Sequence, residues 1–187
     1  STMMRYILCS VFLLVFVIST IIYKFKNKQS KVKQIKEINY SDMRITSIPK
    51  TYAFYTLQKL NCSRCPLLTS IPKINSLQKL KCSSCPQLIS IPKFNSLQIL
   101  NCSSCPQLIS IPKIDSLKEL ICLNCPQLIN IPKIDLLQKL SCSKCTLLTN
   151  IPKFNSLRGL ACSGCLQLSN IPKIDSLQTL ICHSCPL

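Results

Sequence analysis

Cysteine is the residue type whose number and spacing could do chemistry in this chain of 187 residues. Fourteen of the 15 cysteines form Cys-x-x-Cys pairs, and the first two pairs, Cys62-x-x-Cys65 and Cys82-x-x-Cys85, have 16 residues between them. This spacing satisfies the pattern of a four-cysteine zinc site, in which each sulfur lies about 2.3 Å from the metal. Disulfides between equivalent cysteines are a second option, since neighbouring strands lie about 4.8 Å apart.

A third interpretation treats the paired cysteines as core residues. Free cysteine is among the most buried residue types and behaves as a small hydrophobe. Thiolate ligands packed in an apolar stack would be costly, and sharing metals between neighbouring pairs would leave one of the seven pairs without a partner. We favour the core interpretation and therefore expect no cofactor and no bound metal, while the zinc and disulfide alternatives stay open. Disulfides would not persist in a reducing cytosol.

A repeat of 20 residues positions these cysteines. Its first full unit begins at Leu57 and reads LQKLNCSRCPLLTSIPKINS. Leu57, Leu60 and Cys62 should point inward while Lys59 and Asn61 alternate outward, as a short strand requires. Later units begin at Leu77, Leu97, Leu117, Leu137, Leu157 and, as a partial copy, Leu177. Residues 35–56 form a degenerate unit without cysteines, which should cap the N-terminal end of the array.

The template L-x-x-L-x-C-x-x-C-P-x-L-x-x-I-P resembles the leucine-rich repeat, with cysteine at the sixth and ninth positions. The resemblance covers residues 57–187, six full copies and one partial copy. The short Cys-Pro form is also similar to repeats in uncharacterised proteins of amoeba-infecting giant viruses. The resemblance implies a leucine-rich-repeat solenoid of the α/β horseshoe class with a parallel β-sheet on one face.

The expected solenoid is poor in helix. Twenty residues leave no room for a full helix after the strand and its turns. Each unit also contains an Ile-Pro step, such as Ile71–Pro72, and a residue before proline avoids the α region. We therefore expect an extended, polyproline-like return side opposite the sheet.

The N-terminal segment has a different character. Residues 6–23 carry no charge and would span about 27 Å as a helix, close to the thickness of a bilayer core. This stretch is longer than the apolar region of a cleaved signal peptide. We expect one N-terminal hydrophobic helix, with residues 1–23 as a transmembrane anchor and residues 24–34 as a basic linker. Arg5 alone precedes the stretch and six lysines follow it, so the positive-inside rule predicts a single-pass membrane protein with cytoplasmic repeats.

The outward strand positions are the candidate binding site. The predicted face begins basic and becomes apolar in the middle of the array. Apolar residues clustered on a surface are typical of partner anchors, and drift in a repetitive surface is the alternative explanation. The candidate protein-binding residues are Lys59, Lys79, Lys81, Ile99, Asn101, Glu119, Ile121, Leu123 and Lys139.

The composition favours binding over catalysis. Two glycines, one histidine and six scattered carboxylates offer no phosphate loop and no acid–base pair, so we expect no enzyme activity. The net charge of +17 favours anionic surfaces without choosing among them, and nucleic acid is disfavoured because no aromatic stacking residues accompany the charges. We expect a membrane-anchored scaffold or receptor that binds a protein on its strand face. A substrate adaptor for ubiquitin ligases and a zinc- or thiol-binding array are the alternatives, and the oligomeric state stays open.

Overall fold

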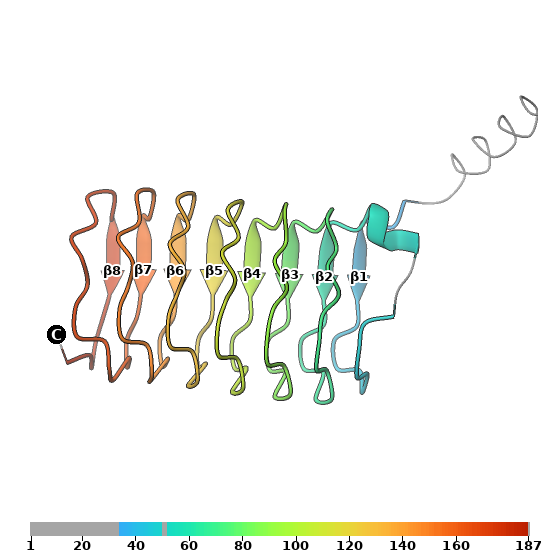
Figure 1. Cartoon of the computed structure of the whole chain (residues 1–187), viewed down its shortest axis with the longest axis horizontal. Coiled ribbons are helices and arrows are strands. Elements are labelled where there is room, and N and C mark those ends of the chain that lie inside the picture. Colours follow the sequence, from blue (N-terminus) through green and yellow to red (C-terminus); the bar gives the residue numbers. More distant parts are fainter. Residues whose placement is uncertain (1–33, 50–51, 187) are drawn as a thin grey trace, which may run out of the picture. The chain divides into compact units, whose positions relative to one another are not determined.

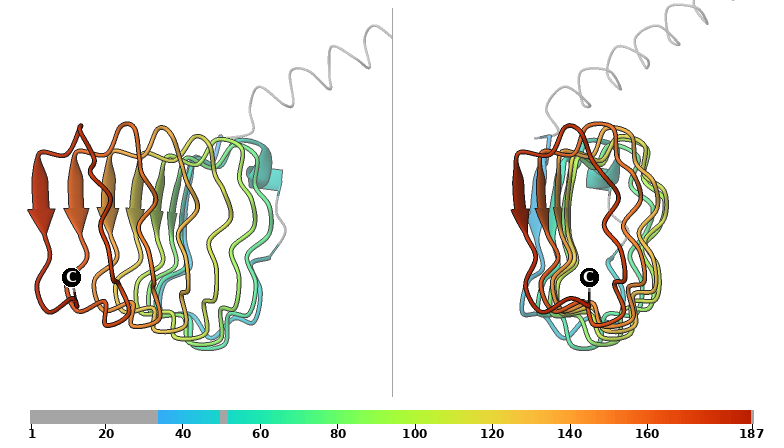
Figure 2. Two further views of the ribbon diagram at one scale, coloured as in Figure 1. Left: turned by 60° about the vertical axis from the view of Figure 1, so that its left-hand side comes forward. Right: turned by 90° about the vertical axis from the view of Figure 1, so that its left-hand side faces the viewer.

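The computed structural model describes residues 34–49 and 52–186, and the chain divides into two compact units, Ser1–Gln34 and Ile35–Leu187. The second unit contains one sheet of eight parallel strands in the order β1 to β8 (Figure 1). Strands that follow one another along the chain are neighbours in the sheet. Each connection is therefore one turn of a solenoid, and the turns stack with the sheet as one wall and the return segments as the other (Figure 2).

Every strand has three residues. The strands are β1 (Glu37–Asn39), β2 (Lys59–Asn61), β3 (Lys79–Lys81), β4 (Ile99–Asn101), β5 (Glu119–Ile121), β6 (Lys139–Ser141), β7 (Gly159–Ala161) and β8 (Thr179–Ile181). A single turn of 3-10 helix, η1 (Tyr52–Tyr55), is the only helical element among the described residues. The prediction of a helix-poor solenoid with a 20-residue spacing and one parallel sheet is confirmed.

The register of the sheet follows the repeat. Leu60 pairs with Leu80 and Leu80 with Leu100, a step of 20 residues that continues to β8. Between β1 and β2 the step is 22 residues, because Ile38 pairs with Leu60. The central leucine of each strand from β2 to β7 is buried, as the alternation of inward and outward positions predicts.

A turn with a left-handed residue ends each strand. In the first full unit Arg64 has a φ of 56°, two residues after the buried Cys62. Such a backbone cannot continue a strand, so the chain turns toward the return side. The equivalent residues of later units are Ser84, Ser104, Asn124, Lys144, Gly164 and Ser184, and Asp42 has the same conformation in the unit that precedes them.

The return side is extended and closes the core. The isoleucine of the Ile-Pro step and the apolar residue three positions after it are buried against the leucines of the sheet, as Ile71 and Ile74 show. Backbone pairing on this side is sparse, since the isolated bridges among the described residues join Ser47 to Ser70 and Ser110 to Asn130. Hydrophobic burial between neighbouring turns therefore stabilises the return side, whereas backbone hydrogen bonds stabilise the sheet.

The predicted anchor in residues 6–23 and most of the predicted linker in residues 24–34 lie outside the described residues. Within residues 34–49 and 52–186, no helix has the length and apolar character needed to cross a bilayer.

Candidate functional site

The cysteines form two columns that run along the inside of the solenoid. The fourteen cysteines of the repeats are free thiols, and the twelve from Cys62 to Cys165 are buried. Cys182 and Cys185, in the turn of β8, are half-buried. The burial expected from the core interpretation is thus confirmed for every repeat except the last.

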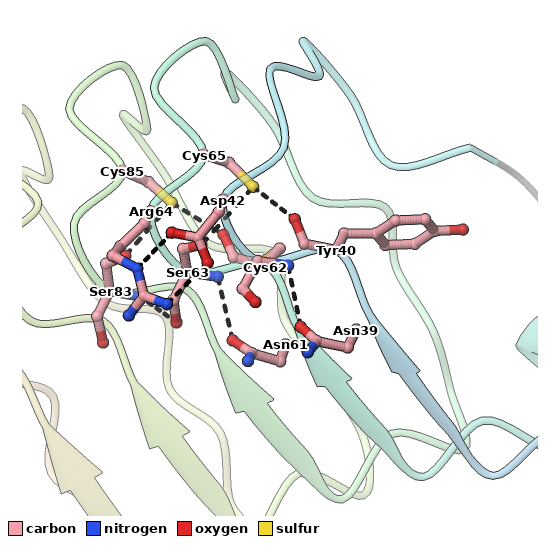
Figure 3. Close-up of polar contacts among 11 residues, drawn as sticks. Asn39, Tyr40, Asp42, Asn61, Cys62, Ser63, Arg64, Cys65, Ser83 and Cys85 are labelled. Atoms are coloured by element: carbon pink, nitrogen blue, oxygen red, sulfur yellow. Dashed lines mark hydrogen bonds and ion pairs between the residues drawn. The ribbon is translucent and has the colours of Figure 1, made fainter.

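The second cysteine of each pair has a specific hydrogen-bonding role. The Cys85 thiol donates to the backbone carbonyl of Cys62 in the preceding turn, with 3.2 Å between sulfur and oxygen (Figure 3). The same contact joins Cys105 to Cys82 at 3.2 Å and Cys185 to Cys162 at 3.0 Å. In the first full unit the Cys65 thiol donates to the carbonyl of Tyr40. A ladder of thiol donors therefore connects each turn to the one before it.

The thiol ladder replaces a backbone bond that the turn removes. In the parallel ladder the N–H of Cys82 donates to the carbonyl of Asn101, so the next donor toward Cys82 would be the N–H of Ser103. That N–H instead donates to the side-chain oxygen of Asn101, at 3.2 Å. The carbonyl of Cys82 then accepts from the thiol of Cys105. The ninth position of the repeat must hold a small side chain that can donate, which cysteine satisfies.

Burial also decides the chemistry of these thiols. It raises the pKa of Cys105 to about 12 and holds the pKa of Cys82 and Cys102 well above the usual range. The physical cause is that a thiolate would lose its hydration in the apolar stack. Because the thiolate is the reactive form, these interior cysteines are inert at neutral pH.

The candidate residues on the strand face do come together. Lys59, Lys79, Ile99, Glu119 and Lys139 are consecutive partners in one outward column, according to the register of β2 to β6. Asn61, Lys81, Asn101 and Ile121 form the adjacent column in the same way. Leu123 lies beside them, two residues after Ile121, with 37% of its surface exposed.

The first part of this face is basic. Lys59 pairs with Glu37 of β1, with 3.3 Å between Nζ and Oε2. Lys79 and Lys81 form no ion pair within the described part of the chain, although Glu37 is close enough to line the same shallow hollow of about 130 Å³. This surface therefore has an excess of positive charge beside the carbonyl and amide groups of β2.

The middle of the face is partly apolar. Ile99 and Ile121 lie on adjacent strands at diagonal positions, because Ile99 pairs with Glu119 and Ile121 pairs with Asn101. Both isoleucines are half-buried between their neighbours, so they expose less surface than the sequence predicts. A second hollow, of about 230 Å³, lies at this level of the sheet and is lined by Gln98, Ile99, Lys118, Glu119, Gln138 and Lys139.

The return side carries an apolar column that the sequence analysis missed. Ile89, Ile109 and Ile129 occupy the same position of three consecutive units, and about half of each side chain is exposed. The sequence contains a signal for this column, because three consecutive units have isoleucine at a position where the units before and after them have Thr69 and Thr149.

The return side also carries a basic column, one lysine per unit, and this column is partly neutralised. Its members are Lys73, Lys93, Lys113, Lys133, Lys153 and Lys173. Asp115 lies between two lysines of this column, 3.9 Å from the Nζ of Lys93 and 3.4 Å from that of Lys113. Asp175 contacts Lys153 and Lys173 in the same arrangement, at 4.0 and 3.8 Å. The strand face near Lys79 and Lys81 lacks such partners, so it is the more suitable of the two for an anionic ligand.

No protein-family model matches the chain, and no curated protein matches it. Its function therefore has to follow from the sheet register, the cysteine columns and the outward strand face.

Proposed function

We propose that the protein is a leucine-rich-repeat scaffold that binds another protein on the face formed by β2 to β6, while the hydrophobic segment of residues 6–23 tethers it to a membrane with the repeats in the cytoplasm. One observation carries the proposal: the outward residues of these strands form two columns in register, basic at one end and apolar in the middle. Among the residues that the structure describes, η1 is the only helical element, so the sheet presents these columns directly to a partner.

The chemistry of the face defines the partner. Lys79 and Lys81 favour carboxylates, because neither lysine has an ion-pair partner within the described residues. Ile121 and Leu123 supply apolar area two strands farther along, at β5, and apolar anchors beside a charged rim are typical of protein interfaces. The matching partner is a protein segment with acidic residues next to a large apolar side chain.

Photo-crosslinking in cells tests the proposal. A photoreactive amino acid replaces Leu123 in one chain and Ile129 in a matched chain; Ile129 belongs to the same repeat but lies on the return side and is 47% exposed. We expect a discrete protein adduct from position 123 that is absent from position 129. Adding Ile121→Asp to the position-123 chain should abolish that adduct, since a carboxylate replaces an apolar anchor.

A second substitution tests the basic part of the face. Lys79→Glu with Lys81→Glu should weaken the adduct at position 123, because the new carboxylates repel an acidic partner, and added salt should partly restore its yield by screening that repulsion. Circular dichroism should show the wild-type fold in each variant. Equal adducts at positions 123 and 129, or an adduct that survives Ile121→Asp, would contradict the proposal.

A further inference from the structure

The turn of β8 differs from the interior turns in one chemical respect. The sulfurs of Cys162, Cys182 and Cys185 all lie within 4.8 Å of one another. Within residues 34–49 and 52–186, they form the one group of three metal-ligating side chains that come this close. Cys162 is buried, whereas Cys182 and Cys185 are half-buried, so this sulfur triangle has an apolar floor and an open side.

We propose that Cys162, Cys182 and Cys185 bind one thiophilic divalent metal ion of the zinc class. In tetrahedral zinc sites each sulfur lies about 2.3 Å from the metal, so the sulfurs are about 3.8 Å apart. Side-chain rotations that shorten the sulfur separations by up to about 1 Å would close the triangle on an ion. The open side leaves a fourth position for water or for an exogenous ligand.

The donor set selects the metal. Thiolates are soft ligands that bind Zn²⁺, Cd²⁺ and Co²⁺ far better than Mg²⁺ or Ca²⁺. Binding replaces three S–H protons by three sulfur–metal bonds and releases three protons to solvent, which leaves the centre with one negative charge. Because protons compete with the metal for the three sulfurs, the affinity should increase with pH.

The interior turns do not offer the same site. Their equivalent cysteines, such as Cys102, Cys122 and Cys125, are fully buried. A metal centre with a net charge would be desolvated there, and no solvent could supply a fourth ligand. The same repeat thus raises the pKa of thiols such as Cys102 inside the solenoid and brings three sulfurs within 4.8 Å of one another in the turn of β8.

Titration of the reduced, full-length protein with Co²⁺ tests the proposal, because thiolate coordination to cobalt produces a charge-transfer absorbance. We expect one Co²⁺ per chain, displacement by one equivalent of Zn²⁺, and a higher melting temperature with metal. The variant Cys182→Ser with Cys185→Ser should lose the absorbance and the thermal shift. It changes only half-buried residues, so circular dichroism should show the wild-type fold.

Cys122→Ala is the control variant, since it removes an interior thiol and leaves the three proposed ligands in place. We expect it to bind one Co²⁺ as the wild type does. No thiolate absorbance in the wild type, or an absorbance that persists in Cys182→Ser with Cys185→Ser, would overturn the proposal. Loss of binding in Cys122→Ala with its fold retained would also overturn it, because the ligands would then belong to the interior stack.

Discussion

The interior cysteine stack and the turn of β8 have the same sequence pattern in two different environments. Inside the array, each Cys-x-x-Cys pair is covered on both sides by neighbouring turns and is fully buried, as at Cys102 and Cys105. In the turn of β8, Cys182 and Cys185 pack against the core but are half-buried. Leu180 is 51% exposed, whereas the equivalent Leu100 is completely buried.

The difference shows that the chemistry of a repeat depends on its neighbours. Burial raises the pKa of a thiol such as that of Cys105, which stays protonated and donates a hydrogen bond to the turn before it, whereas a thiol that reaches water becomes available to metals, oxidants and alkylating agents. Stability in a solenoid also comes largely from contacts between adjacent turns. Variants in the interior stack should therefore lower the stability of the fold. Variants in the turn of β8 should mainly change metal binding and thiol reactivity.

The largest effect expected from this comparison is unfolding in alkali. The pKa of Cys105 is raised from its usual value near 9 to about 12, and those of Cys82 and Cys102 are raised as well. The stabilisation that these protonated thiols contribute is fully present below the pKa of a thiol in the unfolded chain. It is lost as the pH rises from that value toward the pKa of the same thiol in the folded protein. Each such thiol removes about 1.4 kcal/mol of stability per pH unit in that window.

Several interior thiols titrating together should unfold the reduced protein between about pH 9 and 11, because domains are stable by only about 5–15 kcal/mol. Circular dichroism against pH measures the midpoint. Replacing Cys182 and Cys185 by serine should move the midpoint less than replacing two interior cysteines, since these two residues are only half-buried. A native spectrum retained at pH 12 would show that the interior thiols do not limit stability.

A smaller effect is expected when one thiol donor is removed. Cys105→Ala leaves the carbonyl of Cys82 without its recorded donor in a dry core, which should cost about 1–3 kcal/mol of the free energy of unfolding. Cys185→Ala removes the equivalent donor to Cys162, but water can replace it there, so we expect under about 0.5 kcal/mol. Urea denaturation measures both values.

Cys105→Ser is the matched control, because a hydroxyl can donate to the same carbonyl. It should recover most of the stability that Cys105→Ala loses. If serine and alanine are equally destabilising at position 105, the cysteine contributes by packing alone. The ladder of thiol donors would then be incidental to the stability of the fold.

Much of this fold was predictable from the sequence because a strict repeat fixes which residues share a column. The inward positions of Leu60 and Cys62 followed from alternation within the strand, and the absence of a long return helix in the described repeats followed from unit length and the Ile-Pro step. The outward column from Lys59 to Lys139 followed from the 20-residue step alone.

The contacts between turns could not be predicted in the same way. The thiol of Cys105 reaches the carbonyl of Cys82, 23 residues earlier, because the left-handed turn diverts the N–H that would otherwise bond to it. The proximity of Cys162, Cys182 and Cys185 likewise depends on side-chain directions across two turns. Neither fact is visible in the spacing, which favoured a core but was also compatible with zinc sites and disulfides.

The smallest effect concerns the left-handed turn itself. Gly164 has a φ of 71° in the interior of the array, where the equivalent position of the preceding turn holds Lys144 with a φ of 61°. A methyl group added at Gly164 would lie 3.6 Å from the Cγ of Lys144, an ordinary contact. Gly164→Ala should therefore cost about 1 kcal/mol through backbone conformation alone, and Lys144→Gly should stabilise by about 0.5 kcal/mol.

Ser184→Gly makes the corresponding change in the turn of β8, where φ is 55°. Because the cysteines of that turn are only half-buried, its backbone is held less tightly than that of the interior turns, and we expect a gain smaller than that of Lys144→Gly. Thermal melts of the three variants rank the effects. If Ser184→Gly stabilised as much as Lys144→Gly, the turn of β8 would be as tightly held as the interior turns. Its half-buried cysteines would then lack the freedom to close on a metal ion. The thermal melt of Ser184→Gly therefore also tests the proposed metal site.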